Sequence, residues 1–142
     1  MTGLLVCVAV LALASVFGLI RARRDGRVRA VTARGKDEAV LLSAAELGEG
    51  VVLGERATLV QFSTAFCQPC RATRRVLSEV TELVAGVAHV EIDAEQHLEL
   101  VRRLDILRTP TVLVLDAAGR VVKRASGQPR RADVIAALGQ AV

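Results

Sequence analysis

The stretch FCQPC, residues 66–70, places two cysteines two residues apart with a proline directly before the second. Such a pair can hold a metal ion, form a structural disulfide, or carry electrons by cycling between a dithiol and a disulfide. The three uses differ in the further ligands and in the fold that they need, so the rest of the chain must discriminate among them.

The composition argues against a structural zinc site. The 142-residue chain has three cysteines, Cys7, Cys67 and Cys70, whereas a cysteine-only structural zinc site needs four. The two histidines, His89 and His97, do not have the spacing of a zinc finger. With 52% hydrophobic residues and no Trp or Tyr, the chain is expected to form one domain whose core is built from Val, Leu, Ile and Ala.

The N-terminal residues have the composition of a membrane anchor. Residues 3–20 are 18 uncharged and mostly apolar positions, near the lower limit for a helix that spans a bilayer. A signal peptide would carry a positive charge before this run and a small-x-small cleavage site after it. The chain instead starts Met-Thr-Gly, and the run ends at Ile20 against Arg21. We therefore expect residues 1–20 to be a retained transmembrane anchor, with residues 3–20 in contact with the membrane.

A basic segment follows the anchor. Residues 21–36 contain seven basic side chains and one acidic one, a local charge of +6, so the rest of the chain carries −2 of the total of +4. A protein that binds nucleic acid carries its basic residues as a stripe on the folded domain, whereas here they are concentrated in this short segment. We therefore expect no nucleic-acid partner. We expect a juxtamembrane tether, and the positive-inside rule then places residues 37–142 on the cytoplasmic side of the cell membrane as a single-pass protein.

The remaining chain predicts alternating strands and helices. Four apolar, β-prone runs predict strands: residues 57–63, 87–93, 111–116 and 121–125. A capping-box pattern of Ser43 and Glu46 predicts a short helix near residues 44–48, and Pro129 marks the start of a final helix. Apolar residues at helical spacing predict helices after the cysteine pair and over residues 95–104, so that the order of the helices is 44–48, after the cysteine pair, 95–104 and after Pro129. In the third of these, Leu98, Val101 and Leu104 are expected to face inward. Strands joined by helices pair in parallel and a late hairpin adds an antiparallel edge, so we predict an α/β fold with a central mixed sheet flanked by helices.

The cysteine pair and a second motif together resemble the thioredoxin family, in its membrane-tethered form, from about residue 50 to residue 142. CxPC lies at a strand-to-helix junction, and Thr109-Pro110-Thr111 follows Cys70 by 39 residues, directly before an apolar strand. The family keeps a cis-proline facing the cysteines at this place. The resemblance implies a thioredoxin fold and thiol–disulfide exchange with protein disulfides.

The resemblance also implies roles for the residues of both motifs. Cys67, at the start of a helix, is the nucleophile, and Cys70 is the resolving thiol; their disulfide is the redox centre, with no further cofactor. Pro110 is expected to be cis and to present the backbone of Thr109 for pairing with a substrate peptide. Pro69 stiffens the loop at a position where the first helical turn needs no N–H. An upstream reductase or other electron donor is implied as a partner.

Several positions depart from the family pattern. Phe66 and Gln68 replace the usual tryptophan and glycine; Phe66 is expected to cover the sulfurs, and Gln68 to tune the stability of the thiolate. Gln61 stands where the family has a buried aspartate that helps to take the proton of the second cysteine. His89 aligns with the lysine that pairs with this aspartate. We hypothesise that His89 accepts the proton of Cys70, the alternative being a histidine simply packed on a strand.

Two other functions remain open from the residues alone. The two thiols can carry Cu(I) or another metal with further ligands from a partner, or the domain can be a redox-silent docking module. A purely structural disulfide is disfavoured, because a cytoplasmic domain is kept in reducing conditions.

Overall fold

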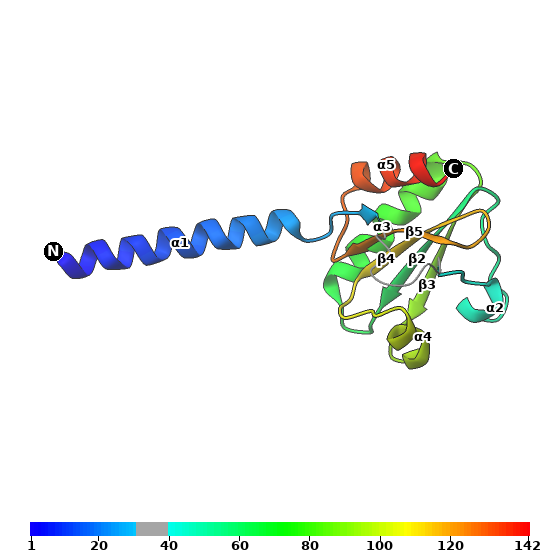
Figure 1. Cartoon of the computed structure of the whole chain (residues 1–142), viewed down its shortest axis with the longest axis horizontal. Helices are drawn as coiled ribbons and strands as arrows, with labels where there is room; N and C mark the ends of the chain where they lie inside the picture. The colour runs from blue at the N-terminus through cyan, green and yellow to red at the C-terminus, as the bar shows by residue number, and fades with distance from the viewer. Residues whose placement is uncertain (31–39) are drawn as a thin grey trace.

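The computed structural model describes residues 1–30 and 40–142, and its elements follow the predicted order (Figure 1). The helices are α1 (Thr2–Arg24), α2 (Ala44–Leu47), α3 (Gln68–Leu83), α4 (Leu98–Arg103) and α5 (Arg131–Ala141). The strands are β1 (Arg29–Ala30), β2 (Ala57–Ser63), β3 (Val87–Asp93), β4 (Thr111–Asp116) and β5 (Val121–Ser126). Residues 31–36 of the expected tether and the expected start of the domain at residue 37 lie outside the described residues.

The strands form one mixed sheet in the order β1-β5-β4-β2-β3. β2 pairs in parallel with β3 and antiparallel with β4, and β4 pairs antiparallel with β5. Because β2 has a partner on both edges and helices over both faces, all seven of its residues are buried. This position explains why the apolar residues of the run ATLVQFS point to both faces of the sheet. The predicted mixed sheet flanked by helices is confirmed.

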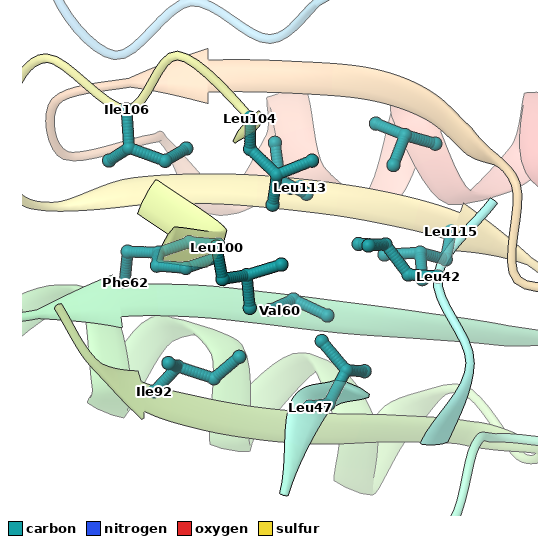
Figure 2. Close-up of a cluster of buried hydrophobic side chains, with 11 residues drawn as sticks. Leu42, Leu47, Val60, Phe62, Ile92, Leu100, Leu104, Ile106, Leu113 and Leu115 are labelled. Carbon is teal, nitrogen blue, oxygen red and sulfur yellow. The ribbon is translucent and has the colours of Figure 1, made fainter. Parts of the chain in front are cut away.

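Side chains on the two faces of the sheet belong to two separate cores. Val60 and Phe62 of β2 lie on the face covered by α2 and α4, in the cluster shown in Figure 2. Leu59 points to the other face, where it packs in a cluster with Leu77 of α3 and Leu138 of α5. Because neighbouring side chains of β2 point to opposite faces of the sheet, this one strand contributes residues to both cores.

Residues 21–30 differ from the expected tether. α1 continues through Arg24, four residues beyond the expected end of the anchor at residue 20. β1 then pairs antiparallel with β5, with Arg29 opposite Arg124, and so becomes an edge of the sheet. The sequence did not predict this strand, because two residues at a sheet edge are too few to show a periodic pattern.

The expected inward position of Leu98 in α4 is wrong. Leu98 is 52% exposed, whereas Leu100 is 8% exposed and packs in the cluster of Figure 2. The helix begins only at Leu98. Val101 and the C-cap residue Leu104 face the core as expected, and Leu100 takes the inward position expected of Leu98. Apolar spacing alone did not discriminate between these rotations of a short helix.

The two leucines of α4 provide a test of this packing. Leu100→Ala is expected to lower the free energy of unfolding by about 2–4 kcal/mol, since it removes a side chain from the core. Leu98→Ala, the same chemical change on the exposed side, is expected to change it by less than about 0.5 kcal/mol. Urea unfolding of the full chain in detergent micelles measures both, and equal losses would contradict the observed rotation of α4.

Candidate active site

The two cysteines of the motif form a disulfide at the start of α3. The Sγ–Sγ distance is 2.09 Å and the Cα atoms are 5.2 Å apart. Cys67 is the N-cap residue of α3 and is half-buried, whereas Cys70 lies in the first turn and is 2% exposed. A partner molecule can therefore reach the sulfur of Cys67 but not that of Cys70.

The N-cap position gives the sulfur of Cys67 an environment that favours negative charge. The backbone N–H of Cys70 donates a hydrogen bond to Cys67 Sγ, with an N–S distance of 3.2 Å. The sulfur thus occupies the place of a capping side-chain oxygen, next to the unpaired N–H groups and the positive end of the helix dipole. Pro69 lies in the first turn, where its missing N–H leaves no helical bond unmade. In the dithiol state the same arrangement stabilises a thiolate at Cys67.

The proline of the second motif lies beside the disulfide loop. The Thr109–Pro110 peptide bond is cis, as expected from the sequence. Thr109 Oγ1 is 3.2 Å from Oγ1 of Thr64, a residue of the loop between β2 and α3. Pro110 itself is buried, and Thr109 is half-buried. The structure therefore brings together two motifs that are 39 residues apart in the chain.

Phe66 does not cover the sulfurs, contrary to expectation. Its side chain is 98% exposed, and Gln68 and Pro69 on the other side of Cys67 are also exposed. Phe66 lies in the tight turn closed by the hydrogen bond from Cys67 N–H to the carbonyl oxygen of Thr64, 3.4 Å long, and a side chain at such a turn faces outward. The ring is thus an apolar surface available to a partner rather than a lid.

Gln61 is completely buried beneath the disulfide, and its amide group is fully paired. Its Nε2 donates to Ser63 Oγ at 2.9 Å and to the carbonyl oxygen of Cys70 at 2.8 Å. A carbonyl can only accept, so the amide nitrogen must face Cys70 and Oε1 must face His89 Nε2, 3.2 Å away. His89 therefore carries a proton on Nε2, and the free lone pair of its neutral form is on Nδ1.

The surroundings of His89 keep it neutral at pH 7. Burial lowers the pKa of His89 below its ordinary value of 6.5, while Glu91 raises it and Arg74 lowers it. Arg74 and Glu91 are themselves joined by two hydrogen bonds of 2.6 Å, so their effects on the imidazole oppose each other. A neutral imidazole can accept a proton. These hydrogen bonds connect His89 to the backbone of Cys70 through Gln61, and not directly to its sulfur.

Two residues of the site gave no signal in the sequence. Ser63 fixes the amide of Gln61, and Thr64 joins the disulfide loop to the proline loop. Small polar residues at the end of a strand are common and belong to no motif, so only the contacts reveal their roles. Cys67, Cys70 and Pro110 lie where β2 leads into α3 and β4 begins, whereas Gln61 and His89 lie within β2 and β3.

Comparison with known proteins agrees with this geometry. The model of the family Thioredoxin matches residues 38–140. The chain is 27% identical over 108 residues to a thioredoxin of Mycobacterium tuberculosis, covering 75% of this chain and 92% of that protein. It is 35% identical over 81 residues to a thioredoxin of Alicyclobacillus acidocaldarius, covering 56% of this chain and 76% of that protein.

Solved structures show the same fold. Chloroplastic thioredoxin z superposes with a TM-score of 0.55 at 28% identity, over 61% of this chain and 78% of that one. A mutant thioredoxin from Halobacterium salinarum superposes with a TM-score of 0.56 over 61% and 75%; at 18% identity, it supports the fold alone. With a family match over most of its length, this chain belongs to the thioredoxin family.

Proposed function

We propose that the protein is a membrane-anchored protein-disulfide reductase in which Cys67 is the nucleophile and Cys70 the resolving thiol. The single observation that carries the proposal is the Cys67–Cys70 disulfide at the N-terminus of α3, with the cis-proline loop beside it. Membership of the thioredoxin family supports thiol–disulfide oxidoreductase activity in general. The substrate class, the direction of electron flow and the membrane location belong to the proposal.

The proposed reaction has two exchange steps. The Cys67 thiolate attacks one sulfur of a protein disulfide, the target S–S bond breaks, and a mixed disulfide forms while the other target sulfur leaves as a thiolate. Cys70 then loses its proton and attacks Cys67 Sγ, which releases the second target sulfur. Two electrons have passed to the target, and the Cys67–Cys70 disulfide remains. A dithiol donor, such as an upstream reductase, must reduce it again.

The unequal exposure of the two sulfurs supports this order of steps. Cys67 is accessible to a target. Cys70 is 2% exposed, so in the proposed reaction it reacts only within the protein, with Cys67. Phe66 offers an apolar contact next to the attacking sulfur, and the backbone of Thr109 beside the cis bond is placed for strand-like pairing with an extended peptide. Gln68, exposed between the sulfurs, is placed to influence the stability of the thiolate.

The proposed membrane location rests on α1. This is the one helix in the described parts of the chain that is long and apolar enough to cross a bilayer, with a mean hydropathy of 2.7 over its apolar window. Arg21, Arg23 and Arg24 lie in its last turn and favour the cytoplasmic side for that end. In the reducing cytoplasm the domain would donate electrons rather than accept them.

The roles of the cysteines predict distinct phenotypes. In an insulin-reduction assay with the full chain in detergent, Cys67→Ser and Cys70→Ser are both expected to fall to the rate of the uncatalysed exchange. Only Cys70→Ser is expected to accumulate a mixed disulfide, seen on non-reducing gels, because the nucleophile remains and the resolving thiol is lost. Cys7→Ser, which removes the third cysteine, is the control and should retain the full rate. A Cys67→Ser protein with wild-type activity would contradict the proposal.

We propose that the second step uses His89 as the proton acceptor for Cys70. Gln61 cannot titrate, but it holds the Cys70 carbonyl and orients His89 so that Nδ1 is free. The acceptor must be neutral, so release of the mixed disulfide should slow as the pH falls through the pKa of His89, which burial places below 6.5.

The two histidines of the chain allow a matched test of this step. His89→Gln is expected to slow release of the mixed disulfide at pH 7 by about tenfold or more and to abolish its dependence on pH between 5 and 7. His97→Gln is the control, since His97 Nδ1 bonds to the carbonyl oxygen of Asp93, 3.0 Å away. Stopped-flow measurement of release gives both profiles. An unchanged profile in His89→Gln would leave His89 as a packed side chain.

A further inference from the structure

The chain passes from the anchor helix directly onto the catalytic domain, through the residues Asp25–Ala30, here called the juxtamembrane segment. Gly26 is buried, and its N–H donates to the carbonyl oxygen of Ser126 at 2.9 Å. Asp25 Oδ1 lies 3.2 Å from Arg108 Nη1. β1 then extends the sheet beside β5. Because the ion pair is exposed and contributes little stability, the backbone bonds are what hold the segment in place.

The loops that receive this segment are the loops of the active site. Gly127, the residue after the acceptor of the Gly26 bond, donates its N–H to the carbonyl oxygen of Pro110 at 2.7 Å. Thr109 contacts Thr64 at 3.2 Å, and the carbonyl of Thr64 accepts the N–H of Cys67 at 3.4 Å. A continuous set of short contacts therefore connects the exit of the anchor to the nucleophilic cysteine.

Gly26 is at a position that only glycine fits. Its φ of +73° is in the left-handed region, and a Cβ there would lie 1.8 Å from the carbonyl oxygen of Gln128. Gly50 has a similar φ of +75°, but a Cβ there would meet nothing within 4 Å. A positive φ alone therefore does not bring a glycine this close to another part of the backbone. The close approach at Gly26 results from the docking of the juxtamembrane segment on the domain.

This docking leaves little space between the domain and the bilayer. Four helical residues and Asp25 separate the end of the apolar run at Ile20 from Gly26, a distance of at most about 13 Å. In Figure 1, α1 extends from the side of the domain where α3 begins and β5 ends. The face that carries the disulfide is therefore turned toward the membrane that α1 would cross.

We propose that the juxtamembrane segment orients the active site toward the bilayer, so that the substrates are disulfides in extended segments of other membrane proteins close to the bilayer surface. A globular domain of 100 residues has a radius of gyration of about 13 Å and is too wide for the gap, whereas an extended chain that leaves the bilayer fits. Phe66 and Leu107, 98% and 85% exposed, lie in the loops before Cys67 and Pro110 and offer apolar contacts there. The inference rests on the proposed function and uses the same two-electron exchange.

Single tryptophans can measure the orientation without any enzymatic readout, since the chain has no Trp. Phe66→Trp marks the active-site face, and Leu83→Trp marks the exposed far end of α3, about 24 Å away. In nanodiscs containing lipids with spin-labelled headgroups, Trp fluorescence is compared with that of the same variant in unlabelled nanodiscs. We expect several-fold stronger quenching for Phe66→Trp. Equal quenching, or stronger quenching for Leu83→Trp, would overturn the orientation.

The substrate class is tested with the full chain in nanodiscs and two substrates: insulin, and a peptide disulfide placed next to a transmembrane helix in the same disc. The wild type should reduce the anchored peptide efficiently and insulin slowly. Gly26→Ala should release the domain and speed insulin reduction several-fold, whereas the matched control Gly50→Ala should not. Insulin reduced equally fast by the wild type and Gly26→Ala would overturn the inference alone. A wild type that reduces neither substrate, in nanodiscs or in detergent, would overturn the proposed function as well.

Discussion

The site depends on the hydrogen bond from the backbone N–H of Cys70 to Cys67 Sγ, 3.2 Å long. It makes the sulfur of Cys67 the cap of α3, where helix N–H groups and the helix dipole favour a thiolate. The same helical turn that provides this donor encloses the second sulfur, which is 2% exposed. In the proposed mechanism, the difference between the attacking Cys67 and the resolving Cys70 is a consequence of this single helical turn.

The buried Gln61 is an amide and therefore cannot accept a proton from Cys70. A carboxylate at this depth would pay a large desolvation cost or hold a proton, whereas a neutral amide with every donor and acceptor paired does neither. An amide cannot titrate, so it stabilises the site without providing a base. The titratable group nearest to it in the bonding network is His89, which burial keeps neutral at pH 7. In the proposed second step, Gln61 thus has the structural role and His89 the role of proton acceptor.

The central strand β2 connects these features to the fold. Val60 and Phe62 pack in the core under α2 and α4, and Gln61 is on the opposite face, toward α3. β2 also pairs with β4 so that Phe62 lies opposite Thr111. This register brings Pro110, immediately before β4, next to the end of β2, from which the cysteine loop begins. The meeting of the two motifs is thus a direct result of strand pairing. The docked juxtamembrane segment uses the next strand, β5, to place the anchor at the same end of the sheet.

Local patterns in the sequence were enough to predict the extents of β2, β3 and β4 and an apolar helix at the N-terminus, and the resemblance to the thioredoxin family predicted the Cys67–Cys70 disulfide. These features depend on continuous apolar runs or on residues three apart, so their signals are local. The exposure of Phe66, the exposed position of Leu98 in α4 and the pairing of β1 with β5 became known only from the folded structure. Each of these depends on which residues, distant in the chain, approach one another. No periodicity or spacing encodes such an approach, because it results from the packing of the whole sheet and its helices.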